Sequence, residues 1–95
     1  MTDADILEIV KLQLGILADT YDTVLTHDIT VAELEIASEG ITLNPDDIKD
    51  CNLVIMYACY LFRKRASMEG MPRMLRYALN NRLMAEKVRF SDGGI

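Results

Sequence analysis

One unbroken apolar stretch, Leu53 to Phe62, limits the folds open to this chain. It holds ten residues, fewer than the roughly 18 that suggest a membrane span. Such a segment is typical of a buried helix against which other helices pack. Asn44 and Pro45 before it suit the N-cap and first helical residue, and Arg63-Lys64-Arg65 after it suits the negative end of a helix. We therefore predict a central helix that starts at Pro45 and ends near this basic triplet.

Apolar residues at helical spacing predict three further helices. The first follows a capping box of Thr2 and Asp5 and stops at Gly15. The second runs from Asp19 or Thr20 to Glu39, and the fourth opens at Met71-Pro72 and fades near Val88. Their apolar stripes are Ile6, Ile9, Val10 and Leu14; Tyr21, Leu25, Ile29, Ala32 and Ile36; and Leu75, Ala78, Leu79 and Leu83. No stretch alternates long enough for a strand, so we predict a small all-α single domain of about four helices over residues 1–90, with a flexible tail at 91–95.

Charge is divided unevenly along the chain. Residues 1–50 contain twelve Asp or Glu against Lys11 and Lys49, a net charge of -10, and residues 51–95 carry a net charge of +5. A chain with an acidic and a basic end can bind copies of itself head to tail, in rings or filaments, and a basic face can also bind nucleic acid. The acidic N-terminus lacks the positive charge of a secretion signal, so we expect synthesis and residence in a cytosol.

Enzymatic chemistry finds little support in the sequence. Cys51 and Cys59 lie about 12 Å apart on one helix, too far for a disulfide, and are expected to be small buried hydrophobic residues. His27, the single histidine, is expected on a helix surface, and no cysteine and histidine spacing fits a metal site. Phosphate-binding loops and nucleophile motifs are also missing. We predict a protein that is no enzyme and needs no cofactor or metal.

The turn between the last two helices carries the most suggestive surface. Five cations fall within fourteen residues there and are predicted to form one basic patch, flanked by two adaptable methionines: Arg63, Lys64, Arg65, Arg73 and Arg76, with Met68 and Met71. Carboxylates of a protein partner and phosphates of a nucleic acid are both suitable ligands for such a patch. We favour the protein partner, because the total charge is negative and aromatic residues among the cations are few.

The second half of the chain resembles the small head–tail connector proteins of tailed phages and prophages. The resemblance rests on Ile48-x-Asp50-Cys51-Asn52-Leu53-Val54-Ile55-Met56-Tyr57-Ala58, on Tyr60-Leu61-Phe62-Arg63-Lys64-Arg65, on Gly70-Met71-Pro72-Arg73-Met74-Leu75-Arg76 and on Leu79-Asn80-Asn81-Arg82-Leu83. It extends over residues 4 to 88, with Tyr21-Asp22 and Glu39-Gly40-Ile41 in the first half. These are packing and surface patterns and include no catalytic signature.

The resemblance implies a structural protein of the virion, assembled in the bacterial cytoplasm and located at the head–tail junction. Its copies would form a ring, usually dodecameric, beneath the portal protein. The ring would extend the DNA channel, with no sequence-specific DNA binding, and offer a platform to the next tail-side connector or stopper protein. The resemblance implies no enzymatic activity, no cofactor and no contact with a membrane.

Two hypotheses follow for the basic patch. In the first, it binds acidic groups of the portal or of a neighbouring copy, whose second helix offers Asp28, Glu33, Glu35 and Glu39. In the second, the chain is a small nucleic-acid-binding phage regulator that reads bases through Asn80, Asn81 and Arg82 of the fourth helix.

Overall fold

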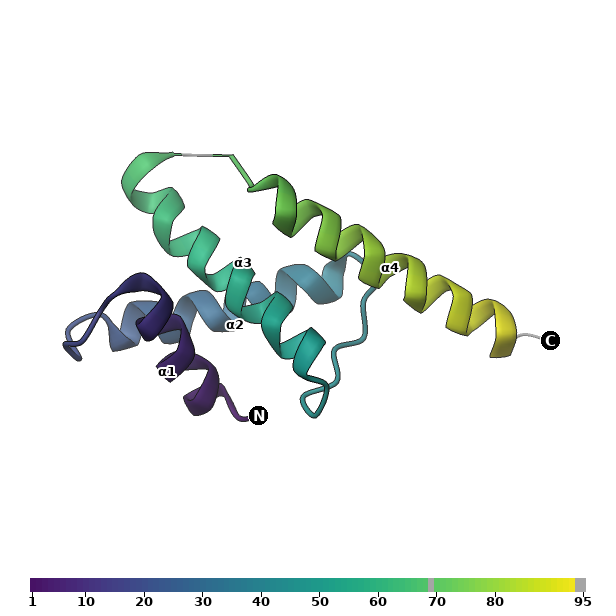
Figure 1. The fold of residues 1–95 in the computed structure, drawn as a ribbon, viewed down its shortest axis with the longest axis horizontal. Coiled ribbons are helices and arrows are strands. Elements are labelled where there is room, and N and C mark those ends of the chain that lie inside the picture. Colours follow the sequence, from purple (N-terminus) through teal and green to yellow (C-terminus); the bar gives the residue numbers. More distant parts are fainter. Residues whose placement is uncertain (69, 94–95) are drawn as a thin grey trace.

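The computed structural model describes residues 1–68 and 70–93, with side chains described as far as residue 88. These residues form four α-helices and no strand: α1 (Asp3–Leu14), α2 (Asp22–Ser38), α3 (Ile48–Ser67) and α4 (Arg73–Gly93). Figure 1 shows α3 crossing α2, with α1 on one side of α3 and α4 extending past the other helices toward the C-terminus. The predicted all-α fold is confirmed.

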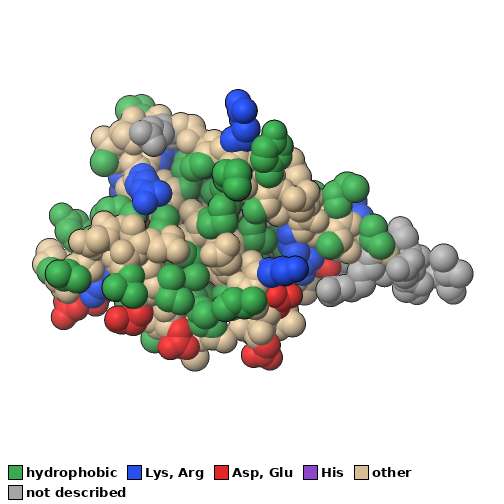
Figure 2. Space-filling model, in the orientation of Figure 1, with side chains coloured by type: hydrophobic (Ala, Val, Ile, Leu, Met, Phe, Trp, Pro, Cys, Tyr) green, Lys and Arg blue, Asp and Glu red, His purple; other side chains and the backbone are tan. Residues whose placement is uncertain are grey.

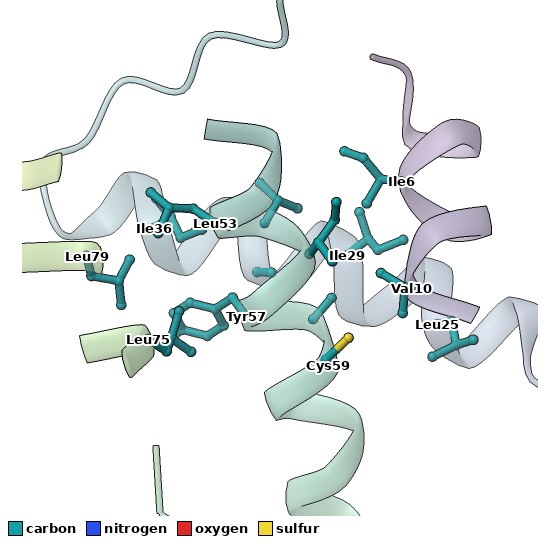
Figure 3. Packing of buried hydrophobic residues seen from close by; sticks show 14 of the residues in the cluster. Ile6, Val10, Leu25, Ile29, Ile36, Leu53, Tyr57, Cys59, Leu75 and Leu79 are labelled. Atoms are coloured by element: carbon teal, nitrogen blue, oxygen red, sulfur yellow. The ribbon is translucent and has the colours of Figure 1, made fainter. Parts of the chain in front are cut away.

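Helix α3 is the central element, as its apolar sequence predicts. It contacts each of the other three helices, and most of its run from Leu53 to Cys59 is buried. In Figure 3, Leu53 and Tyr57 of α3 lie among residues of α2 and α4, and Tyr57 points toward Leu75. The core therefore lies mainly between α3 and α2, and α1 and α4 pack against this pair of helices.

The predicted apolar stripes supply most of the remaining core. The buried members are Ile6, Val10, Leu25, Ile29, Ala32, Ile36, Leu75 and Leu79, whereas Ile9, Leu14, Ala78 and Leu83 are half-buried and pack against them. Tyr21 lies at the edge, where its ring meets that of Phe62 edge-on at 5.7 Å between centroids. Periodicity therefore predicted the buried face of each helix.

Both ends of α1 agree with prediction. Thr2 and Asp5 form a reciprocal capping box, and Gly15 follows the helix in the left-handed conformation with φ 72°. Gly40 likewise has φ 101° after α2, a region that favours glycine. Local sequence determines these helix ends.

The start of α3 was predicted wrongly. Asn44 and Asp47 close a turn, in which the Asn44 side chain accepts from the Asp46 N–H, and Asp47 is the N-cap of a helix that begins at Ile48. Asp50 explains the delay, because its buried carboxylate accepts from the Asn44 N–H and fixes the turn from inside the protein.

Two other boundaries also differ. Helix α2 starts at Asp22, later than the predicted Asp19 or Thr20, and α4 continues beyond Val88 to Gly93. Of the predicted tail at 91–95, residues 91–93 belong to α4, and residues 94 and 95 lie outside the described residues.

Candidate protein-binding site

The predicted basic patch divides into cations that hold the fold together and cations that face solvent. Arg65 and Arg76 form ion pairs with acids of α2 in the same chain. Arg63, Lys64 and Arg73 are exposed, and the described residues show no ion pair for any of them. Arg65 and Arg76 thus neutralise acids of the same chain although their side chains are 49% and 42% exposed, whereas Arg63, Lys64 and Arg73 form no such pair in the part of the chain that the structure describes.

Arg65 clamps Asp28 with both ends of its guanidinium group. Nη1 donates to Oδ2 at 2.7 Å and Nη2 to Oδ1 at 2.5 Å, which makes the pair bidentate. Asp28 is 1% exposed, so Arg65 takes the place of water as the partner of its carboxylate. The contact joins α2 to the last turns of α3 across 37 residues of sequence.

The predicted acidic face of α2 is largely used inside the chain. Glu39 accepts a hydrogen bond from Arg76 of α4, and Asp28 is bound by Arg65. Glu33 lies beside Asp3 of α1, and its burial, together with the Asp3 charge, raises the pKa of Glu33 to about 7. Glu35 is the one member of this set that is exposed. The expectation that these four acids offer one docking face is therefore corrected.

Exposed apolar side chains accompany two of the solvent-facing cations, since Lys64 and Met68 line one surface hollow and Tyr77 follows Arg73 by about one turn of α4. Met68, in the left-handed conformation after α3, is 89% exposed, and Met74 and Tyr77 stand on the outer side of α4. Met71, which was predicted to flank the patch, is half-buried against the core. Lys64 lies over the Tyr60 ring at 5.8 Å. We name the exposed set the basic corner: Arg63, Lys64, Met68, Arg73, Met74 and Tyr77.

Figure 2 shows how charge is distributed on one face of the molecule. In this view, basic side chains stand on the upper edge, over the end of α3 and the start of α4, and no acidic side chain of a described residue is seen there. Acidic side chains line the lower edge, and hydrophobic ones gather between α3 and α4. The basic corner thus combines positive charge with apolar area, as protein-binding surfaces do.

A separate groove lies between the first half of α3 and the middle of α4. It has a volume of about 570 Å³ and is lined by Ile48, Asn52, Leu53, Met56, Ala78 and Ala85, among others. Met84 and Val88 are exposed farther along α4. Helix α4 therefore buries one side against the core and leaves apolar residues on its outer side.

A buried charge network, which sequence reasoning missed, anchors α4. Arg82 donates to Asp50 at 2.8 Å and to the Thr42 carbonyl at 2.8 Å, and it also meets Glu86 at 3.4 Å. Glu86 in turn accepts from the Thr42 N–H at 2.7 Å. These donors lower the pKa of Glu86, and the Asp50 carboxylate raises that of Arg82.

The signal for these pairs was present in the helical spacing. Asp28 lies three residues after Leu25 and four before Ala32, so it belongs to the buried stripe of α2. Arg82 lies three residues after Leu79 in the same way. A charged residue inside an apolar stripe requires a partner of opposite charge within reach.

Arg82 is consequently not available to read DNA bases. Asn80 and Asn81 are exposed, but the guanidinium group between α4 and α3 is held by Asp50. The predicted base-reading set therefore loses its only charged member.

The other candidate residues have ordinary structural environments. Both cysteines are buried free thiols, and burial raises the pKa of Cys59. His27 is exposed on α2. Within the described residues, no three His, Cys, Asp or Glu side chains are grouped so that they could hold a metal ion.

Comparison of the chain with protein-family models, curated proteins and solved structures finds no match. None of the described helices is both long and apolar enough to cross a membrane. The resemblance to head–tail connectors accordingly stays a prediction from the sequence.

Proposed function

We propose that this chain is a structural assembly subunit, a head–tail connector that forms a ring beneath a phage portal protein. The ring would extend the DNA channel, carry the next tail-side protein and take its place at the head–tail junction of the virion. The proposal combines the sequence resemblance over residues 4 to 88 with the character of the exposed surface.

The observation that carries the proposal is the basic corner. Its cations are separate from those that stabilise the fold, since Arg65 and Arg76 are paired internally and Arg63 and Arg73 are not. Met68, Met74 and Tyr77 are exposed in the same two segments, Met68 in one hollow with Lys64 and Tyr77 about one helical turn after Arg73. Arginine, methionine and tyrosine are enriched in the contact regions of protein interfaces. The surface is therefore suited to an acidic protein partner, as a subunit in an assembly requires.

Native mass spectrometry tests the proposal. The protein is measured alone and with the portal protein of the same genome, at low and at moderate salt. We expect rings of the protein alone, or portal-bound copies that match the portal symmetry. The variant Tyr77→Glu, which places a charge within the basic corner, should lose this assembly while its circular dichroism stays unchanged. A chain that remains monomeric and ignores the portal would contradict the connector role.

The nucleic-acid hypothesis is the weaker of the two. Its cations would have to bind phosphates without Arg82, on a chain whose total charge is -5. Fluorescence polarisation with duplex DNA at low salt, where nonspecific binding is strongest, distinguishes the hypotheses. We expect no binding there, and DNA binding that is lost in Arg63→Glu would favour the regulator.

A further inference from the structure

If the basic corner binds a second copy of the chain, the surface that it contacts should contain acidic residues that are exposed and not already paired. Asp28 of α2 and Glu39, which directly follows α2, are bound by arginines of their own chain, and Glu33 lies beside Asp3. Helix α2 therefore retains little free negative charge for a neighbour. A partner surface in a second copy has to come from another element.

Helix α1 offers such a surface. Asp5, Glu8 and Leu12 are spaced by three and four residues, which places them on one face of the helix, and all three are exposed. Leu12 is 71% exposed and Leu17, in the loop after α1, is 89% exposed. The capping box holds the Asp5 carboxylate and lowers its pKa, so this residue stays charged. We name this set the α1 acidic face: Asp5, Glu8, Leu12 and Leu17.

We propose that the α1 acidic face of one copy docks on the basic corner of the next copy. The inference rests on the proposed role as an assembly subunit and names the two surfaces that assembly would use. Asp5 and Glu8 supply carboxylates for Arg63, Lys64 and Arg73. Leu12 and Leu17 supply apolar area for Met68, Met74 and Tyr77. Each surface carries one sign of charge together with unpaired apolar side chains, so the two are complementary in both respects.

The two surfaces are different and share no residue, so a head-to-tail contact between them is heterologous. The α1 acidic face comes from α1 and the loop after it, and the basic corner comes from the end of α3 and the start of α4. A head-to-tail contact leaves one surface of each kind free in a dimer, so further copies can add until a ring closes or a filament grows, whereas a two-fold dimer that used both surfaces at once would stop at two copies. A two-fold contact of basic corner with basic corner would instead bring like charges together.

Complementary charge reversal tests the contact directly. The first variant, Glu8→Lys with Leu12→Lys, disables the α1 acidic face and leaves the basic corner intact. The second variant, Arg63→Glu with Arg73→Glu, disables the basic corner and leaves the α1 acidic face intact. All substituted side chains are exposed and form no ion pair within the described residues, so both variants should keep the circular dichroism of the native chain. Glu35→Lys, an exposed acid of α2, is the matched control.

Sedimentation velocity at low salt provides the measurement. We expect each double variant alone to associate at least tenfold more weakly than the native chain, and Glu35→Lys to associate as the native chain does. Mixing the two double variants should give a one-to-one dimer that grows no further, because that pair retains a single intact contact. This outcome would establish both surfaces and the heterologous geometry.

Three outcomes would overturn the inference. One is native-like assembly by either double variant, the second is loss of assembly in Glu35→Lys, and the third is a native chain that stays monomeric in low salt. The connector role is tested separately, by portal binding. If both double variants still bind the portal protein as the native chain does, this contact is refuted and the connector role is left intact. If the native chain does not bind the portal protein, the connector role itself is refuted.

Discussion

At the scale of single residues, the buried carboxylate of Asp28 is the most demanding group in the fold. Its two oxygens are bound by one side chain, Arg65, which is itself half exposed. Removing one partner of a buried ion pair leaves the other charge buried without a counter-charge, which strongly destabilises the folded state. Replacing both partners by apolar residues costs much less stability. The stability of the α2–α3 contact is therefore sensitive to this arginine.

Replacement of Arg65 by alanine should lower the free energy of unfolding by about 2–3 kcal/mol. This is less than the loss expected when one partner of a fully buried ion pair is removed, because solvent partly screens the arginine. Urea denaturation followed by circular dichroism measures the change. Arg63→Ala, in the same helix and without an ion pair among the described residues, should change stability by less than about 0.5 kcal/mol. Equal effects of the two substitutions would mean that Asp28 does not depend on Arg65.

Glu33 makes folding stability depend on pH near neutrality. Burial and the neighbouring Asp3 raise the pKa of Glu33 to about 7 in the folded protein, from an ordinary value of 4.5. The folded state therefore holds a proton that the unfolded state releases. This contribution to stability is complete below pH 4.5 and is lost as the pH rises through about 7.

We expect the free energy of unfolding to fall by about 1–2 kcal/mol between pH 5 and pH 8 through Glu33, after allowance for solvent screening. Urea titrations at several pH values measure this fall. The glutamine in the variant Glu33→Gln cannot ionise, so its free energy of unfolding should change less between pH 5 and pH 8. In the variant Asp3→Asn, the fall in this free energy should occur at lower pH. A pH profile that is the same in the native chain and in Glu33→Gln would refute the assignment.

At the scale of elements, the described part of α4 is held by a small apolar contact, by the Arg76–Glu39 ion pair and by the charge network of Arg82. Leu75 and Leu79 are its fully buried apolar residues, and Arg82 connects its middle to α3 and to the loop at Thr42. The helix has fewer contacts with α3 than α2 has. Local stability follows local packing, so α4 should be the first helix to open.

The variant Arg82→Ala should therefore release α4 and the loop at 40–47 before the rest of the protein. It leaves Asp50 and Glu86 without their arginine, at a cost of about 3–5 kcal/mol. Hydrogen exchange read by mass spectrometry should show protection lost in α4 while α1 and α2 keep theirs. Lys87→Ala, exposed in the same helix, serves as the control. Uniform loss of protection in all helices would show that α4 is no separate unit.

Sequence reasoning succeeded for features that neighbouring residues determine. The Thr2 cap, the Gly15 stop and the buried stripes depend on spacing within one helix, and each was predicted. The start of α3 was wrong because Asn44 and Pro45 suit a turn as well as a helix start, and distant packing around Asp50 decided between them. The basic patch was misjudged for the same reason, because the partners of Arg65 and Arg76 are 37 residues away in sequence.

At the scale of the whole molecule, two groups of charges have different surroundings and should respond differently to salt. Asp28–Arg65 and Asp50–Arg82 each include a buried carboxylate, whereas Glu8, Arg63 and Arg73 are exposed. Ions screen exposed charges within about 10 Å at 0.1 M salt and screen buried pairs much less. Folding and assembly can therefore be separated by ionic strength.

We expect association to weaken about tenfold between 50 and 500 mM salt, while the melting temperature of the monomer changes by only a few degrees. Sedimentation velocity and differential scanning calorimetry on the same samples give both quantities. Arg73→Gln should reduce the salt dependence of association and leave melting unchanged. Association that is unaffected by salt would mean that the charges of the basic corner do not contribute to it.

The separation of internal from exposed charges also bears on how such a protein can evolve. Asp28 with Arg65, and Asp50 with Arg82, are bound within the chain, so a change in one residue demands a compensating change in the other. Arg63 and Arg73 are exposed and form no ion pair among the described residues. A lineage can therefore alter these two positions one at a time and acquire a new partner, while the inherited fold stays intact.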